Sequence, residues 1–109
     1  MDYVDEQNTS VLELTFKDHE MELVTPDSAA YRIDDILTAA VIKDWSSFTP
    51  TGPVHDVVIL DTENKILNQT NEYEERIVTV RYTYDVNKYG KKEYRYRVQN
   101  LKLITTPAP

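Results

Sequence analysis

Large apolar residues and polar residues alternate with a period of two through the last third of the chain. Between residues 76 and 85, the even-numbered positions carry most of the large apolar side chains, namely Val78, Val80, Tyr82 and Tyr84. The odd-numbered positions carry Ile77, Thr79, Arg81 and Thr83. Because successive side chains of a strand point to opposite faces, this pattern is typical of a half-buried β-strand. No segment shows a long helical periodicity, so the sequence predicts an all-β domain.

A second long strand is predicted to return along the first. Residues 87–90, Asn-Lys-Tyr-Gly, supply the side chains of a tight turn. Beyond this turn, the apolar residues again occupy even positions as far as Val98, and then shift to odd positions at Leu101 and Leu103. The shift predicts a β-bulge at residues 99–100, since one extra residue moves every following side chain to the other face.

Alternation also marks the first part of the chain. In residues 11–17 the apolar side chains after Val11 lie at even positions, which predicts a strand. Residues 17–20 have the composition of a turn into a second strand over residues 21–25, so we expect a first hairpin here. Residues 31–37 are ambiguous, because Asp34-Asp35 could start a helical turn or bend into a strand. We expect irregular structure there.

Two further strands separated by a loop are predicted in the middle of the chain. Residues 40–45 alternate, with Val41 and Trp45 on one face. Residues 46–53 contain two prolines, a glycine and several hydroxyl side chains, and therefore predict a loop. Residues 54–60 are apolar on both faces around Val57, Val58 and Ile59, as expected of a central strand that is covered on both faces.

The number of strands, about seven, favours an antiparallel immunoglobulin-like β-sandwich, with a small β-barrel as the alternative. The length of 109 residues corresponds to one domain. The chain contains no cysteine, so packing rather than disulfide bonds must stabilise the fold. We expect a polar N-terminal arm over residues 1–10, a single β-sandwich domain over residues 11–104, and an extended tail over residues 105–109.

The sequence carries no signal for a membrane. No apolar run approaches the roughly 20 residues that span a bilayer. The first ten residues are acidic and polar, unlike the basic and then apolar start of a signal peptide. We therefore expect a soluble protein that is made in the cytosol and has no membrane partner.

No group of residues has the spacing of a catalytic, cofactor or metal site. Gly52 and Gly90 are the only glycines, so no glycine-rich phosphate loop is expected. His19 and His55 are not spaced to pair with a nucleophile or a metal ligand. Carboxylates cluster at Asp34-Asp35, at Asp61-Thr62-Glu63-Asn64, and at Glu72, Glu74 and Glu75. They lack the spacing of a calcium-binding loop, and we expect them to be solvated. We expect no enzymatic activity, no cofactor and no metal.

Charge is strongly polarised along the chain. Residues 1–75 hold 4 basic against 17 acidic residues, whereas residues 76–109 hold 8 against 2, which divides the net charge of −7 into −13 and +6. If the two parts lie on different faces, the surface is dipolar and suits steering of a partner or head-to-tail contact between copies. Alternatively, basic strands pair with acidic ones within the domain and the dipole cancels.

The last hairpin combines tyrosines with cations and is the candidate interface. The residues expected to make contacts are Arg81, Arg95, Arg97, Lys91, Lys92 and Tyr89. Aromatic side chains beside cations can also hold single-stranded nucleic acid. However, alternation places most of the tyrosines opposite the arginines, and the negative net charge repels phosphates. We therefore expect core tyrosines and an exposed arginine stripe that binds protein rather than nucleic acid.

Five segments carry a family resemblance that covers nearly the whole chain. They are Ala30-Tyr31-Arg32-Ile33-Asp34-Asp35-Ile36-Leu37-Thr38, Trp45-Ser46-Ser47, Asn64-Lys65-Ile66, Glu74-Glu75-Arg76-Ile77-Val78-Thr79-Val80 and Tyr96-Arg97-Val98-Gln99-Asn100-Leu101. In this order, they resemble small β-sandwich proteins encoded among the head and tail structural genes of tailed bacteriophages. The shared elements are mostly strand patterns and turn residues.

The resemblance implies a non-enzymatic virion protein, synthesised in the cytoplasm of the bacterial host. The expected role is a capsid decoration or accessory protein, and a head-to-tail connector or tail component is a close alternative. The expected partners are the major capsid protein, connector subunits and other copies of the chain. A carbohydrate-binding or adhesion module is the alternative from a different class, in which exposed tyrosines would stack on sugar rings.

Overall fold

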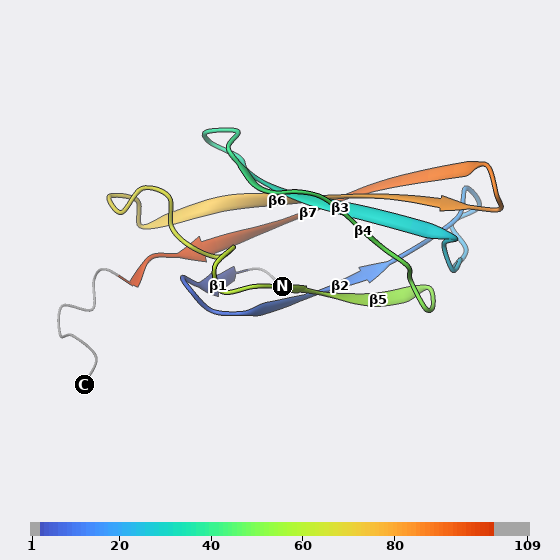
Figure 1. The fold of residues 1–109 in the computed structure, drawn as a ribbon, viewed down its shortest axis with the longest axis horizontal. Helices are drawn as coiled ribbons and strands as arrows, with labels where there is room; N and C mark the ends of the chain where they lie inside the picture. Colours follow the sequence, from blue (N-terminus) through green and yellow to red (C-terminus); the bar gives the residue numbers. More distant parts are fainter. Residues whose placement is uncertain (1–2, 102–109) are drawn as a thin grey trace.

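The chain forms seven β-strands in two sheets in the computed structural model, which describes residues 3–101 (Figure 1). The strands are β1 (Tyr3–Asp5), β2 (Ser10–Thr15), β3 (Ser28–Asp35), β4 (Val41–Phe48), β5 (Val54–Ile59), β6 (Tyr73–Tyr84) and β7 (Lys88–Gln99). Within these residues, no helix has the length and apolar character needed to cross a membrane. The predicted all-β class is confirmed.

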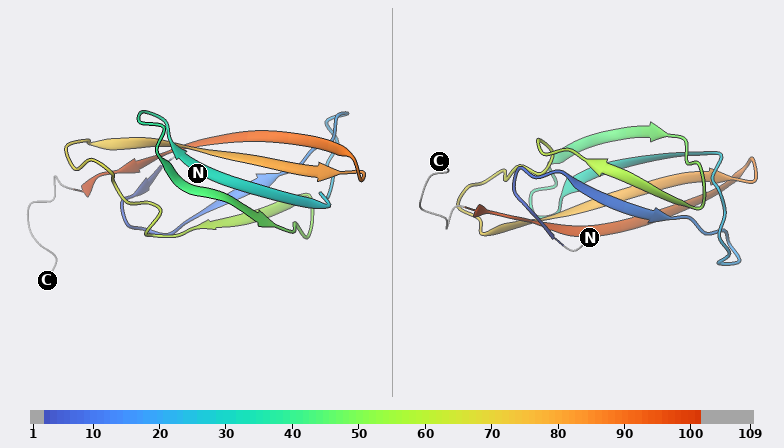
Figure 2. Two further views of the ribbon diagram at one scale, coloured as in Figure 1. Left: turned by 45° about the horizontal axis from the view of Figure 1, so that its top comes forward. Right: turned by 90° about the horizontal axis from the view of Figure 1, so that it is seen from below.

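The two sheets form an immunoglobulin-like sandwich. Five strands lie in the order β1-β7-β6-β3-β4, and β2 pairs with β5 in a separate sheet (Figure 2). In chain order, β3, β6 and β7 therefore correspond to the C, F and G strands of an immunoglobulin domain, and β2 and β5 correspond to B and E. All pairs are antiparallel except β1 with β7, which is parallel.

The core fills the space between the inner faces of the two sheets. Even-numbered residues of β6 from Glu74 to Tyr84 are buried, and so are Tyr96 and Val98 of β7, which confirms the predicted parity of both strands. The opposite sheet supplies Leu12, Leu14, Val57 and Ile59. With no disulfide available, this apolar burial is the main stabilising contribution.

The first predicted hairpin is reduced to its turn, with one β-bridge and two backbone hydrogen bonds, from Asp18 to Glu22 and from Val24 to Phe16. β2 pairs along its whole length with β5, from Ser10 opposite Ile59 to Thr15 opposite Val54. Residues 21–25 form no strand, and only an isolated bridge joins Lys17 to Leu23. The side chain of Asp18 accepts hydrogen bonds from two following backbone amides, which satisfies these donors within the turn instead of in a β-ladder.

Residues 31–37 are largely a strand, contrary to the irregular structure expected there. β3 runs from Ser28 to Asp35 and lies between β4 and β6. Its two aspartates point to opposite faces, where each meets an arginine: Asp34 pairs with Arg32, and Asp35 with the buried Arg76. These ion pairs allow a strand to carry two adjacent carboxylates.

The middle strands also differ from their predictions. β5 is not covered on both faces, because it belongs to the two-stranded sheet: Val57 and Ile59 are buried, whereas Val54 and Val58 are about half exposed. β4 continues to Phe48, so the loop predicted over residues 46–53 begins later. Backbone pairing with β3 extends the strand through its serines.

The ends of the domain require three corrections. β7 ends at Gln99 without a bulge, and the side-chain amide of Asn100 turns inward to donate to two backbone carbonyls of the β5–β6 loop. The turn before β7 comprises residues 85–87, so Lys88, Tyr89 and Gly90 already belong to the strand. The expected N-terminal arm contributes β1, in which Val4 packs into the core. Leu103 and the expected tail over residues 105–109 lie outside the described residues.

Candidate functional site

The outer face of the five-stranded sheet carries an exposed tryptophan in contact with two arginines. Trp45 of β4 is 41% exposed, although tryptophan is usually a core residue in β-proteins. The guanidinium carbon of Arg32 lies 5.8 Å from the centroid of the indole ring, and that of Arg81 lies 5.7 Å from it. The contact with the indole ring orients Arg81 before any partner binds, whereas Arg32 is also held by a bidentate ion pair with Asp34, at 2.7 and 2.9 Å.

A shallow hollow of ≈ 440 Å³ lies beside this stack. It forms because the neighbouring outward positions of β3 and β4 hold small side chains, while larger side chains surround them. The lining residues on the outer face include Ser28, Ala30, Trp45, Ser47, Arg81 and Tyr89. Tyr89 is 75% exposed at its rim. The hollow thus presents aromatic edges, hydroxyl groups and one guanidinium together.

Five of the six predicted interface residues lie on this outer face. Arg81 on β6, and Tyr89, Lys91, Arg95 and Arg97 on β7, occupy the exposed positions of their strands. Lys92 does not join them, because its position in β7 has the inward parity of Tyr94. Its ammonium group lies 5.8 Å from the centroid of the Tyr94 ring and donates a hydrogen bond of 3.1 Å to the carbonyl of Thr15.

Several cations of this face have no anionic partner among residues 3–101. Arg97 is partly neutralised, because its guanidinium lies 3.7 Å from a carboxylate oxygen of Glu75 and also stacks on Tyr73. Lys91 and Arg95 form no ion pair within the described part of the chain. Glu93 is exposed between them on β7, so the face carries both signs, but cations are in excess and the face attracts carboxylates or other anions.

Neither Trp45 nor Arg32 was predicted from the sequence to contribute to this site. Parity within each strand shows which face a side chain takes. It does not show that β3 lies between β4 and β6, which is what brings Arg32 and Arg81 to the same indole ring. A tryptophan at an exposed strand position would have been the only local signal.

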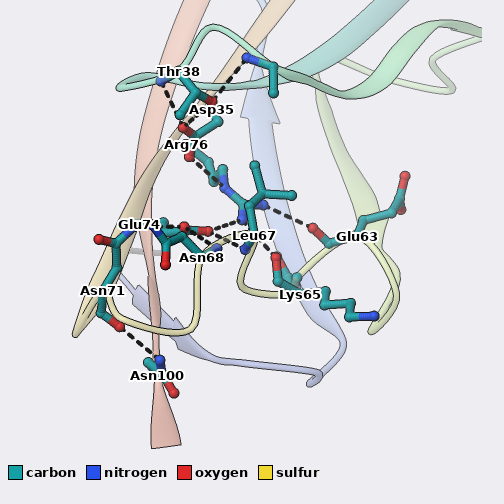
Figure 3. A network of polar contacts seen from close by, with 12 residues as sticks. Asp35, Thr38, Glu63, Lys65, Leu67, Asn68, Asn71, Glu74, Arg76 and Asn100 are labelled. Carbon is teal, nitrogen blue, oxygen red and sulfur yellow. Dashed lines mark hydrogen bonds and ion pairs between the residues drawn. The ribbon is translucent and has the colours of Figure 1, made fainter. Parts of the chain in front are cut away.

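Behind the face, a buried arginine connects the sheet to the β5–β6 loop (Figure 3). Arg76 has no exposed side-chain surface. Its guanidinium donates to the carboxylates of Glu74 (2.9 Å) and Asp35 (3.3 Å), and to the carbonyls of Glu63 (3.1 Å) and Lys65 (2.8 Å). Each acceptor comes from a different position in the chain, so one side chain holds β3, β6 and the loop together.

Glu74 is the second centre of this network. Its carboxylate accepts hydrogen bonds from the amides of Leu67 (2.7 Å) and Asn68 (3.0 Å) and from the side chain of Asn71 (2.9 Å). Burial alone would raise the pKa of Glu74, but these hydrogen bonds and Arg76 lower it below its ordinary value. The carboxylate therefore stabilises the fold at neutral pH, and this contribution is lost as the pH falls through the lowered pKa.

Two of the carboxylates expected to be solvated, Asp35 and Glu74, are buried instead. Asn64, expected to serve the geometry of a turn, is also buried, and each of the three residues has hydrogen-bonding partners. The side chain of Asn64 donates to the carbonyl of Asn8 and accepts from the hydroxyl of Tyr96. These residues position the loop rather than a reactive group. Over residues 3–101, no cluster of three or more histidine, aspartate or glutamate side chains could hold a metal ion.

Alkaline pH is expected to destabilise the fold through Tyr96. Burial raises the pKa of Tyr96 from its ordinary 10.0 to about 12, although the positive charge of Arg76 acts to lower it. Between these values the unfolded chain loses the phenolic proton while the folded chain keeps it, so stability is complete below pH 10 and falls as the pH rises toward 12. Urea unfolding across this range, followed together with phenolate absorbance, measures the effect. The Tyr96→Phe variant should show a shallower decline, and an unchanged decline would contradict this origin.

The outer face has the chemistry of a binding surface for anionic or ring-shaped groups. Oriented guanidinium groups can pair with carboxylates, and the exposed indole can pack against apolar or sugar rings. No family model matches the chain, and comparisons with curated proteins and with solved structures found no match.

Proposed function

We propose that this protein is a non-enzymatic structural component of a tailed-bacteriophage virion that docks on a repeated protein surface. The observation that supports this proposal is the contact of the exposed Trp45 with Arg32 and Arg81 on a sheet face that also carries unpaired cations. The most specific form of the proposal is a capsid decoration or accessory protein. A head-to-tail connector or tail component uses the same surface and is the alternative location.

The physical chemistry of the face suits protein recognition. Tryptophan and arginine are the residues that most often dominate protein–protein binding energy. Here the side chain of Arg81 is already oriented by the indole ring, so less side-chain entropy is lost on binding. On a virion lattice, many weak contacts of this kind add through effective concentration. The expected partner surface is acidic, because the face carries unpaired cations.

Charge reversal on this face is expected to weaken attachment to virus particles. The double variant Arg81→Glu/Arg95→Glu should lower the affinity for capsids of the source phage by about tenfold or more at physiological salt. Co-sedimentation with purified capsids measures the bound fraction. Lys65→Glu/Lys88→Glu is the matched control, because it makes the same change in net charge at exposed lysines away from this face. Equal attachment of both variants would reject the face as the docking surface.

The hollow beside Trp45 supports a second candidate function, which is binding of carbohydrate. Its hydroxyl side chains and exposed aromatic rings are the groups that contact sugar rings. Trp45 is the only tryptophan of the chain, so its fluorescence reports directly on the hollow. A saturable change on titration with surface glycans, absent in Trp45→Ala and accompanied by no attachment to particles, would favour an adhesion module over the virion role.

A further inference from the structure

We propose that copies of this protein associate head to tail, with the outer face of the β2–β5 sheet of one copy docking on the outer face of the five-stranded sheet of the next. The inference rests on the proposed function, because it uses the same docking face and names a second copy as one of its partners. The proposal is based on two pairs of like charges and on the apolar residues beside them.

The first pair of like charges lies on the five-stranded sheet. Arg81 of β6 stands directly opposite Lys91 of β7 in the antiparallel register, and both side chains are exposed. Neither side chain forms an ion pair within residues 3–101. Like charges at directly opposed positions destabilise an antiparallel pair of strands. An acidic partner placed over both cations would remove this repulsion.

The second pair lies on the opposite side of the sandwich and has the opposite sign. Glu13 of β2 stands directly opposite Asp56 of β5, and both carboxylates are exposed without an ion pair in the described structure. Neither β2 nor β5 contains a lysine or an arginine. The outer face of this sheet is therefore acidic, and the repulsion of its own pair would be relieved by a basic partner.

Exposed apolar side chains accompany both charge pairs. Val11 and Val58, which also stand opposite one another two residues from the acidic pair, are 51% and 50% exposed. On the basic face, Trp45 and the hollow lie beside Arg81. Each face thus presents a charge pair next to uncovered apolar surface. Contact between the two faces would bury apolar side chains and oppose charges of different sign.

The placement of the faces decides the symmetry of the contact. The two outer faces lie on opposite sides of the sandwich (Figure 2), so a copy that uses one face to bind leaves the other face free. Contact between two identical faces would bring like charges together. The association is therefore heterologous, which produces rows or closed rings rather than a two-fold dimer.

Sedimentation velocity of the purified protein at several concentrations and two salt levels tests the inference. We expect the average mass to rise with concentration at low salt and to return to that of the monomer at high salt, because salt screens exposed charges. The neutral variants Glu13→Gln/Asp56→Asn and Arg81→Gln/Lys91→Gln should each associate at least tenfold more weakly than the original chain. Their thermal unfolding should change little, since each variant loses an internal repulsion and Arg81→Gln also loses the contact with Trp45.

Mixing the two variants gives the decisive result. One variant retains an intact basic face and the other an intact acidic face, so a mixture should form a discrete one-to-one dimer that neither variant forms alone. A mixture that remains monomeric, a wild-type chain that remains monomeric at all concentrations, or a closed dimer unaffected by both variants would each overturn the proposal. A monomer that saturates capsids would reject only this inference, and rows that ignore capsids would reject only the virion role.

Discussion

Replacing Arg76 with methionine is expected to lower the free energy of unfolding by about 3–5 kcal/mol, the range found when one partner of a buried ion pair is removed. The substitution keeps much of the side-chain volume but leaves the carboxylates of Asp35 and Glu74 buried without their cation. The carbonyls of Glu63 and Lys65 also lose their donors. Equilibrium unfolding in urea measures the change.

The control for Arg76 is the same substitution at an exposed arginine. Arg95→Met lies on the outer face with no ion pair in residues 3–101, and it should change stability by less than about 0.5 kcal/mol. If Arg76→Met fails to fold, Arg76→Lys provides a milder test, because an ammonium group cannot reach all four acceptors of the guanidinium. A stability of Arg76→Met within about 1 kcal/mol of the original chain would contradict the role assigned to the network.

Replacing Gly90 with alanine is expected to lower the free energy of unfolding by roughly 2–4 kcal/mol, from overpacking and a lost hydrogen bond. Gly90 stands opposite Tyr82 in the β6–β7 register, and an added methyl group would overlap the distal end of the tyrosine ring. The ring cannot move freely, because its hydroxyl donates to the carbonyl of Lys17 (2.6 Å) and the ring forms a T-shaped contact with Phe16. Thermal and urea unfolding both report the loss.

A double-mutant cycle separates this clash from other effects of the substitution. In a Tyr82→Leu background the shorter side chain leaves room for the methyl group, so Gly90→Ala should then cost much less than in the original chain. Equal costs in both backgrounds would show that the glycine is required for a reason other than the ring. Its φ is not positive, so backbone strain is not the expected alternative.

The long strands were predictable because burial on one face imposes a period of two that is visible in the sequence. The even positions of β6, and Tyr96 and Val98 of β7, are buried as expected, and the same rule places Arg81, Lys91 and Arg95 outside. It also shows why Lys92 was assigned wrongly, since its parity is that of Tyr94. The strand β3 was missed because its adjacent aspartates resemble a turn, whereas arginines from β3 and β6 neutralise them in the sheet.

The candidate site was only partly visible in the sequence. The cations of the last hairpin follow from parity, but the indole ring that orients Arg81 lies on a strand two positions away in the sheet. The burial of Arg76, Glu74 and Asn64 was also not predictable, because polar residues near a turn are usually solvated. Their burial depends on partners supplied by the β5–β6 loop and by distant strands.

By itself, the sequence determined that the chain is an all-β domain, which residues of its longest strands face the core, and that its basic residues concentrate in the last hairpin. Only the tertiary structure decided which strands pair, and therefore that Arg81 faces Lys91, that Glu13 faces Asp56 and that Arg76 is enclosed by carboxylates. The reason is that alternation specifies the face of a side chain within its own strand. Backbone hydrogen bonds between strands are nearly the same for every residue pair, so long-range packing selects the neighbours.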